Sequence, residues 1–353
     1  MDRTHSIGRN AILRQGGDSQ RGPLPPPLRR GGRPLGFILV GLLLFGGADV
    51  ASGHRIPDPP AISDAPTPSP VWDHADRGRA HQRARLHIRT SPSEVSIYLN
   101  GAFRGRTDHR GNLVIADLPP GRYRLRARKL GTRERHLDLR LAPGEYRRLG
   151  IILRPTGDPA ELAYQRGEQL REEKKYQASL SWYRLALQRR TPFPEAHVGL
   201  ARSFLALHQY DEAQAEAEAA IGERQGVYPE GYTVLGRALH GKGLYEEALA
   251  AYRRALRQAG NFSPEAHAGL ALVLDDMDEP ERAIVHMRMA IEQNGDAEPT
   301  LYNLLGNMLL RIEALREAIA AFQTYLNLAP QSDLAPAIRS LVDQLRAEMN
   351  ESQ

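Results

Sequence analysis

A regular repeat of small residues is the feature that most limits what this chain of 353 residues can fold into. A glycine or alanine recurs every 34 or 35 residues: Gly167, Ala201, Gly236, Ala271 and Gly306. Sixteen residues later comes a position that is mostly large: Tyr183, Ala217, Tyr252, Met287 and Phe322. Small residues let paired helices approach closely, and large ones fill the space between pairs. The period therefore predicts stacked helical hairpins over residues 158–330.

This pattern resembles the tetratricopeptide repeat (TPR), whose period is close to 34 residues. Ser179, Pro280 and Tyr325 depart from it. We expect Pro280 to break the tight turn between the two helices of the fourth repeat and to bend it locally. Residues 331–353 are predicted to form a capping helix and tail. The apolar residues on one face of that helix are Leu334, Ile338, Leu341, Val342 and Leu345.

The resemblance implies five repeats and a concave groove that binds a protein or peptide partner. Carried over position by position, it places candidate groove residues at Tyr164, Arg171, Arg202, Arg237, His240, Asn303 and Asn307. Arg202, Arg237 and Asn307 are suited to hold the carboxylates or the backbone of a peptide. The lysine and asparagine clamp of chaperone-binding TPR proteins is not reproduced, so an acidic C-terminal peptide is not specifically indicated. The alternative is that these positions are simply exposed polar residues.

Residues 85–154 have the alternation and the turn residues of a small all-β sandwich. Strands are predicted around Val95–Leu99, Leu113–Ile115, Tyr123–Arg128, Leu137–Leu141 and Leu149–Leu153. The dipeptide Asn100-Gly101 indicates a hairpin, because a tight primed turn needs positive φ at both central residues. The fold class that follows is a multidomain chain with a β sandwich before an all-α solenoid.

The β segment resembles the PEGA domain, a small β module of bacterial envelope and surface-associated proteins. The resemblance rests on Ser91-Pro92, on the strand from Val95 to Gly101, on Leu118–Tyr123 and on Gly131. Asn100 and Asp108 depart from the family pattern. Members share no catalytic residues, so the resemblance implies a location in the envelope more than a chemistry.

Four arginines alternate along one predicted strand and share one face of it: Arg122, Arg124, Arg126 and Arg128. Such a row suits the phosphates or carboxylates of an anionic envelope polymer or a lipid headgroup. This gives a second hypothesis, a surface-attachment protein, and the plain alternative is a solvated outer face. We do not expect nucleic acid as a partner, because the basic strands lack interleaved exposed aromatic residues.

The N-terminal part divides into three segments by composition. Residues 1–34 are basic and rich in Gly and Pro, which predicts disorder. Residues 35–52 contain a short apolar run followed by small residues, which is typical of a secretory signal peptide. A cleaved signal is favoured over a single-pass membrane anchor, and a buried helix is a third alternative. Residues 53–84 are a Pro-rich linker. We therefore expect a location in the periplasm or cell envelope, with membrane contact only through the N-terminal segment if it is not cleaved.

No catalytic, cofactor or metal site is predicted. The chain has no cysteine, which excludes thiolate zinc sites and cysteine nucleophiles. The run from Gly236 to Lys242 nearly spells a phosphate-binding loop, but Gly243 replaces the hydroxyl residue and the segment is a repeat helix with its turn. His197 and His267 occupy the same repeat position, where packed histidines are favoured over a metal pair. The leading hypothesis is a non-catalytic envelope scaffold.

The charge is divided unevenly along the chain. Residues 77–154 hold 19 basic and 6 acidic residues, a net charge of +13, whereas residues 155–353 hold 20 and 29, a net charge of −9. Opposite charges on adjoining parts leave two alternatives open. The basic β module docks on its own acidic solenoid, or it binds an anion outside the chain.

Overall fold

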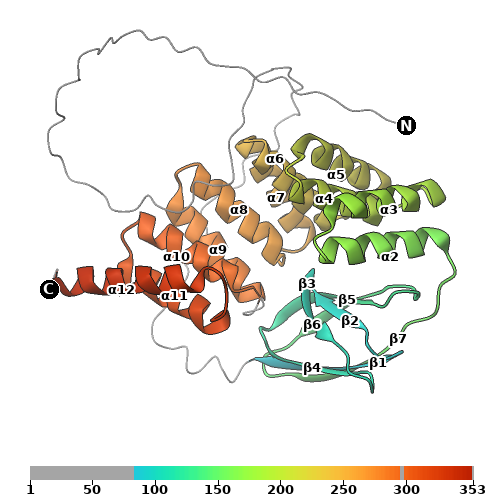
Figure 1. Ribbon diagram of the computed structural model, residues 1–353, viewed down its shortest axis with the longest axis horizontal. Helices are drawn as coiled ribbons and strands as arrows, with labels where there is room; N and C mark the ends of the chain where they lie inside the picture. The colour runs from blue at the N-terminus through green and yellow to red at the C-terminus, as the bar shows by residue number, and fades with distance from the viewer. Residues whose placement is uncertain (1–82, 295–297, 352–353) are drawn as a thin grey trace, which may run out of the picture. The chain divides into compact units, whose positions relative to one another are not determined.

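The computed structural model describes residues 83–294 and 298–351, which belong to one compact unit, residues 70–353 (Figure 1). The predictions for residues 1–34, for the apolar run of 35–52 and for nearly all of the linker lie outside the described residues. Within the described residues, no helix combines the length and the hydropathy that a membrane span requires.

Seven strands form the β part of the unit. In chain order they are β1 (Ala84–Ser91), β2 (Ser96–Leu99), β3 (Ala102–Arg106), β4 (Asn112–Leu118), β5 (Gly121–Arg128), β6 (Arg135–Leu141) and β7 (Tyr146–Ile152). One sheet has the order β4-β1-β7, with β7 parallel to β1, and the other has the order β3-β2-β5-β6. This agrees with the small β domain expected from the alternating pattern.

Alternation along the strands builds the core of the β domain. Leu86, Ile88, Ile97 and Leu125 are fully buried in one cluster to which both sheets contribute. The hairpin prediction is confirmed at Asn100 and Gly101, which have φ of 51° and 84° between β2 and β3. The sequence analysis did not predict β1 or β3. In β1 the apolar and basic residues do alternate, so the pattern that would have revealed this strand is present.

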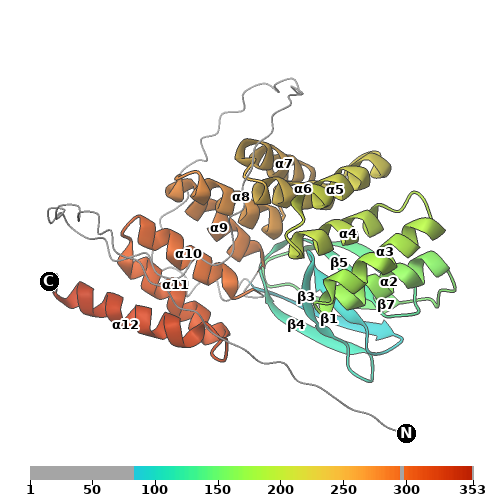
Figure 2. The same cartoon turned by 45° about the horizontal axis from the view of Figure 1, so that its top comes forward.

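Among the described residues, ten helices pair into five hairpins, and an eleventh follows them (Figure 1, Figure 2). The pairs are α2 (Pro159–Glu172) with α3 (Tyr176–Arg189), α4 (Pro194–Ala206) with α5 (Tyr210–Arg224), α6 (Pro229–Gly241) with α7 (Tyr245–Gln258), α8 (Pro264–Asp276) with α9 (Pro280–Asn294), and α10 (Thr300–Arg311) with α11 (Leu315–Leu328). The last helix is α12 (Ala335–Glu351).

Buried aromatic rings join successive repeats. A Cβ atom added to Gly167 or to Gly199 would lie 2.8 or 2.4 Å from the ring of Tyr183, so this ring fits between two glycines of neighbouring repeats. Tyr252 has the same relation to Gly236 and Gly269. The small residues of the repeat thus make room for large ones, as the pattern predicted.

Every turn between the two helices of a repeat contains one residue in the left-handed region. These residues are Lys174, His208, Gly243, Asp278 and Glu313. The expectation that Pro280 breaks the fourth turn is wrong. Pro280 is the first residue of α9, where the missing N–H would have had no partner inside the helix. The turn keeps its form, and Glu279 N donates to Leu274 O at 2.9 Å.

The segment predicted to cap the array contains α12, which places Ile338, Val342 and Leu345 in the same core as the last repeats. Leu334 is the exception, because it precedes the helix and is 43% exposed. Among the described residues, three hydrophobic clusters are built from residues 84–345. All three cores lie within the compact unit of residues 70–353.

Candidate binding site between the β domain and the repeats

Two of the four arginines on β5, Arg126 and Arg128, face the first helix of the array. Arg126 Nη1 and Arg128 Nη1 lie 3.1 and 3.2 Å from Glu168 Oε2 on α2, and Arg128 also pairs with Glu172. Arg171 Nη2 reaches the same Glu168 oxygen at 3.1 Å, and the Tyr183 hydroxyl donates to Oε1 at 2.6 Å. Glu168 is thus a buried carboxylate with four donors, and two of them come from the β domain.

The charges in this cluster stabilise one another. Burial alone would raise the pKa of Glu168, but Arg171, Arg126 and Arg128 outweigh it and hold that pKa well below its usual range. Burial would likewise lower the pKa of Arg126, whereas the negative charge of Glu168 raises it well above the ordinary value. The cluster is therefore fully ionised at neutral pH. A buried charged cluster of this kind fixes the orientation of the parts that it joins.

Three further contacts hold the β domain against the helices. Gln165 of α2 accepts from Gly131 N at 3.0 Å and donates to Thr132 O at 2.5 Å. The ring of Phe262, before α8, packs edge to face on Tyr123 with the centroids 5.4 Å apart. Arg104 of β3 donates to the backbone of Asn294 at the end of α9. The β domain therefore contacts the array at its first and fourth repeats.

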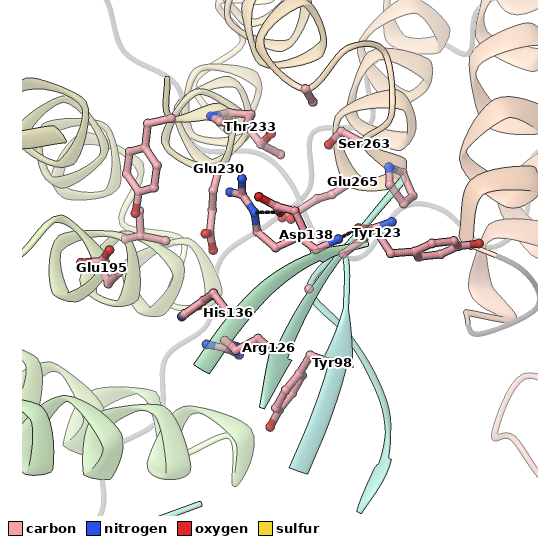
Figure 3. Close-up of a pocket in the computed structure, with 18 of the residues that line it drawn as sticks. Tyr98, Tyr123, Arg126, His136, Asp138, Glu195, Glu230, Thr233, Ser263 and Glu265 are labelled. Carbon is pink, nitrogen blue, oxygen red and sulfur yellow. Dashed lines mark hydrogen bonds and ion pairs between the residues drawn. The ribbon is translucent and has the colours of Figure 1, made fainter. Parts of the chain in front are cut away.

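A cavity of about 700 Å³ lies between these contacts. Figure 3 shows strand residues such as Tyr98, Arg126 and His136 on one side of it, and Glu195 and Glu230 from the helices on the other. The helical wall comes from the first helices of repeats one to four, α2, α4, α6 and α8. In the TPR resemblance, the first helix of each repeat lines the concave groove. The cavity is the part of the predicted groove that the β domain covers without filling.

The cavity wall combines paired charges, apolar surface and three buried polar groups that have no partner in the described part of the chain, one of which is Asn100 Nδ2 of the β domain. Arg202 Nη2 lies 3.3 Å from Glu230 and 3.0 Å from Glu265. Among the described residues, the buried Arg202 Nε and Tyr228 hydroxyl have no hydrogen-bond partner. Val227 also lines the cavity, and it is 66% exposed. Donors beside apolar surface can bind the carbonyl groups and side chains of an extended polypeptide.

The structure separates the seven predicted groove residues into two groups. Tyr164, Arg171 and Arg202 line the cavity, although Tyr164 is nearly buried and both arginines have carboxylate partners. The other four lie outside it. His240 Nε2 is 2.7 Å from Asp276 Oδ2. Arg237 is exposed, and no carboxylate of the described residues lies within ion-pair distance of it. Asn303 and Asn307 are half-buried on α10.

The four predicted anion-binding arginines also separate. Arg122 and Arg124 are exposed and line the cavity, and Arg124 pairs with Asp138 of β6 at 3.2 Å. Arg126 and Arg128 form ion pairs with Glu168 of α2. Of the two docking alternatives left open by the charge distribution, the contacts favour the intramolecular one for this pair. Of the four arginines in the anion-binding hypothesis, only Arg122 and Arg124 remain accessible to an external anion.

Several residues of the site were not singled out in the sequence. These residues are Glu172, Tyr228, Phe262 and Tyr98. The guanidinium groups of Arg126 and Arg128 lie over the Tyr98 ring, 4.5 and 5.4 Å from its centroid. The opposite net charges of the two parts indicated that they attract each other. Which carboxylate meets which arginine depends on the angle of docking, and the sequence pattern does not contain that angle.

His197 and His267, which share a repeat position, lie in different surroundings. His197 Nδ1 is 2.6 Å from Glu216, whereas His267 is fully buried and stacks on His286 with their Nδ1 atoms 3.1 Å apart. Within the described residues, no three histidine or acidic side chains form a cluster that could hold a metal ion.

Comparison with known proteins supports the assignment of the helical part. Residues 198–264 and 269–333 match the profile of the tetratricopeptide repeat family. The matched residues cover four of the five hairpins, α4 to α11, and α2–α3 is a further hairpin of the same kind. TPR repeats generally act as scaffolds for protein–protein interaction. A comparison with curated proteins finds no match.

Solved structures with a similar fold cover about half of this chain. A thermophilic TPR protein of Thermus thermophilus is 26% identical, with a TM-score of 0.46, over 53% of this chain and 99% of that one. Pseudomonas aeruginosa PilF is 16% identical (TM-score 0.47), over 54% and 86%. YrrB, described as a TPR protein with an unusual peptide-binding site, is 18% identical (TM-score 0.38), over 52% and 93%.

Proposed function

We propose that this protein is a non-catalytic scaffold of the cell envelope that binds an extended segment of a partner protein. The segment binds in the cavity between β5–β6 and the helices α4, α6 and α8. The observation that carries this proposal is the cavity itself. It lies on the side of the array that the TPR resemblance makes concave, and its lining residues include buried hydrogen-bond donors that no described residue satisfies.

The chemistry of the wall suits a polypeptide better than a small charged ligand. Most charges in the wall already have partners, such as Arg202 with Glu265 and Arg124 with Asp138, so the cavity has no strong net preference for one sign. The Tyr228 hydroxyl and Arg202 Nε lie buried just beneath the wall without partners among the described residues, so a segment that displaces the covering side chains gains two donors for its backbone carbonyls. Val227 and Phe262 offer apolar surface to side chains. The β domain forms one wall of the site, so its position selects what enters.

Site-specific photo-crosslinking tests the proposed site. A photoreactive residue at position 227 lines the cavity, and one at Gln188, exposed on α3 and not part of the wall, is the matched control. We expect position 227 to capture one partner segment and position 188 to capture none. The double variant Arg202→Gln, Tyr228→Phe should abolish capture at position 227. Equal capture at both positions, or capture that the double variant leaves unchanged, contradicts the proposal.

The envelope location is supported by the sequence of residues 1–52 and by the PEGA resemblance of the β domain. A basic segment, a short apolar run and small residues after it are what an export signal or an anchor requires. Cell fractionation with N-terminal sequencing of the native protein tests this part. A mature N-terminus near residue 52 indicates a cleaved signal, and an intact N-terminus in the membrane fraction indicates an anchor. An intact protein in the cytoplasmic fraction would contradict the envelope location.

An anionic envelope polymer is the second candidate partner, and the arginine row of β5 is the feature of the sequence that suggests it. Arg122 and Arg124 are the strand residues that remain accessible to it. Binding of such a polymer depends steeply on salt, and it should be lost in the variant Arg122→Glu, Arg124→Glu. Binding of a peptide in the cavity should respond instead to Arg202 and Tyr228.

A further inference from the structure

A second basic surface lies on the sheet β4-β1-β7. Its outward side chains include three arginines and three exposed apolar or aromatic residues, and we call this set the outer basic face. Its members are Arg85, His87, Arg89, Val114, Tyr146, Arg148 and Ile152. The inward residues of the same strands, such as Leu86, Ile88 and Ile151, belong to the core of the β domain. The outer basic face therefore points away from the sheet that meets α2.

The pairing of the strands brings the members of this face together. Arg85 is opposite Tyr146, and His87 is opposite both Arg148 and Val114. The Arg148 guanidinium lies 5.6 Å from the centroid of the Tyr146 ring. His87 Nδ1 is 3.2 Å from the Tyr146 hydroxyl. The basic and apolar groups thus form one continuous patch across three strands.

These three strands contain a single acidic residue, Asp117, which lies next to the irregular register at the end of β4. This distinguishes the outer basic face from the arginine row of β5, where Arg126 and Arg128 already have carboxylate partners on α2. Among the described residues, no carboxylate lies within ion-pair distance of the three arginines of the face. The face therefore carries a net positive charge that can attract an anionic partner.

Large apolar side chains stand among these arginines. Ile152 is 68% exposed, Val114 is 54% exposed and Tyr146 is 51% exposed. A partner that offers only phosphates would leave Ile152 and Val114 in water. A lipid bilayer offers phosphates to the guanidinium groups, an interfacial layer to tyrosine, and the edge of the acyl region to the aliphatic side chains.

We propose that the outer basic face binds the surface of an anionic phospholipid membrane. Arg85, Arg89 and Arg148 bind lipid phosphates, while Tyr146, Val114 and Ile152 enter the interfacial layer. This surface is distinct from the peptide cavity, because none of these residues lines that cavity. The proposal therefore does not depend on the proposed function, and a partner segment and a membrane can be bound at the same time.

Vesicle co-sedimentation of residues 70–353 tests the proposal, since this unit contains its own cores and lacks the apolar N-terminal run. The probes are vesicles of phosphatidylcholine alone and vesicles in which about a third of the lipid is phosphatidylglycerol. We expect binding to the anionic vesicles only, and we expect it to weaken as salt screens the charges. Each basic residue near such a surface contributes about a fivefold factor in partitioning. The variant Arg85→Glu, Arg89→Glu, Arg148→Glu should therefore reduce partitioning by more than about 100-fold.

A matched control separates this face from net charge. The variant Arg189→Glu, Arg257→Glu, Arg316→Glu makes the same charge change at exposed positions on α3, α7 and α11, and it should keep most of the binding. A second variant, Val114→Ser with Ile152→Ser, keeps the charges and should weaken binding by roughly tenfold through lost apolar contact. Circular dichroism of each variant shows whether it is folded.

Four results would overturn the proposal. They are no binding to anionic vesicles, equal binding to neutral and anionic vesicles, equal losses in the two triple variants, and a dimer in solution that dissociates only in the variant of the outer basic face. The last result would assign the face to a second copy of the chain. Binding to a nucleic acid by the same arginines, without vesicle binding, would likewise replace the membrane as partner.

Discussion

At the scale of single residues, Glu168 decides most about how the two parts of this protein meet. Its carboxylate is buried on α2 and accepts from two arginines of β5, from Arg171 and from Tyr183. In an isolated TPR array such a residue would line an open groove. Here it is the anion around which the interface between the β domain and the array is built.

Replacing Glu168 with glutamine keeps its shape and removes its charge. The substitution leaves Arg126, Arg128 and Arg171 as buried cations without their carboxylate, so we expect the free energy of unfolding to fall by about 3–5 kcal/mol. Urea denaturation monitored by circular dichroism measures it. Glu173→Gln, at the exposed end of the same helix, should leave the free energy of unfolding nearly unchanged. A small and equal effect of the two substitutions would contradict the role given to Glu168.

The stacked pair His267–His286 makes stability depend on pH. Burial lowers the pKa of His286 from 6.5 to about 4, with further lowering by His267, Arg282 and Arg253, and burial also lowers the pKa of His267. Because the folded state resists protonation that the unfolded state accepts, the contribution of these histidines is complete above pH 6.5 and is lost as the pH falls from 6.5 towards 4.

Between pH 7 and pH 5, the native protein should therefore lose about 2 kcal/mol more free energy of unfolding than the variant His286→Asn. Urea titrations of both proteins at the two pH values give this difference. Parallel losses in the two proteins would show that His286 does not titrate across this window. Glu168, whose pKa is held well below its usual range, becomes protonated at lower pH, and groups that titrate alike in both proteins cancel in the difference.

At the scale of elements, the helical hairpin is the unit, and glycine positions set how closely hairpins stack. Gly199 of α4 faces the ring of Tyr183 of the preceding repeat, and a Cβ atom there would lie 2.4 Å from Cε1. Tyr183 is fully buried and cannot move aside. Helix starts are set locally as well, since Asp158 accepts from Ala160 N at 2.9 Å and Ser263 Oγ accepts from Ala266 N at 3.4 Å.

Two glycine-to-alanine substitutions should therefore have opposite effects. Gly199→Ala forces the Tyr183 ring out of its site and should lower the free energy of unfolding by about 1–3 kcal/mol. Gly222→Ala lies in α5, where an added Cβ meets nothing within 4 Å. It should raise the free energy of unfolding by up to about 1 kcal/mol, because glycine is a poor helix former. Thermal denaturation of both variants provides the comparison, and a stabilising Gly199→Ala would contradict the packing described.

At the scale of the whole molecule, docking of the β domain converts an open groove into a partly covered cavity. The contacts occur at α2, at Phe262 and at Asn294, and the cavity lies between them. The same docking uses one basic sheet face inside the protein and leaves the other basic face outside. The distribution of charge within the β domain thus gives its two sheets different roles.

Reversal of the interface charges should separate the two parts. In the variant Arg126→Glu, Arg128→Glu, two carboxylates would meet Glu168 and Glu172. We expect the β domain to detach while both parts stay folded, so the radius of gyration from small-angle scattering rises and Gly131 N loses its hydrogen-exchange protection. Arg122→Glu, Arg124→Glu makes the same charge change on the same strand, and it should leave both observables unchanged. An unchanged radius in the first variant would contradict the ionic basis of docking.

The sequence by itself determined the elements of this protein and their class, because the information needed for them is local. The spacing of Gly167, Gly236 and Gly306 specifies the helical repeat, and Asn100-Gly101 specifies a hairpin, since each depends on residues close together in the chain. The sequence analysis also placed Arg126 and Arg128 on one face of one strand. It expected a bent turn at Pro280, where the first position of a helix in fact accommodates proline without loss.

Only the tertiary structure decided what the groove and the arginines do. Tyr98 and Glu172 are 74 residues apart in the chain but share a hydrogen bond, and Arg104 reaches Asn294 across 190 residues. Such contacts follow from the angle at which two folded parts meet. Many weak contacts of complementary shape and charge together determine that angle, and no periodic pattern in the sequence predicts it.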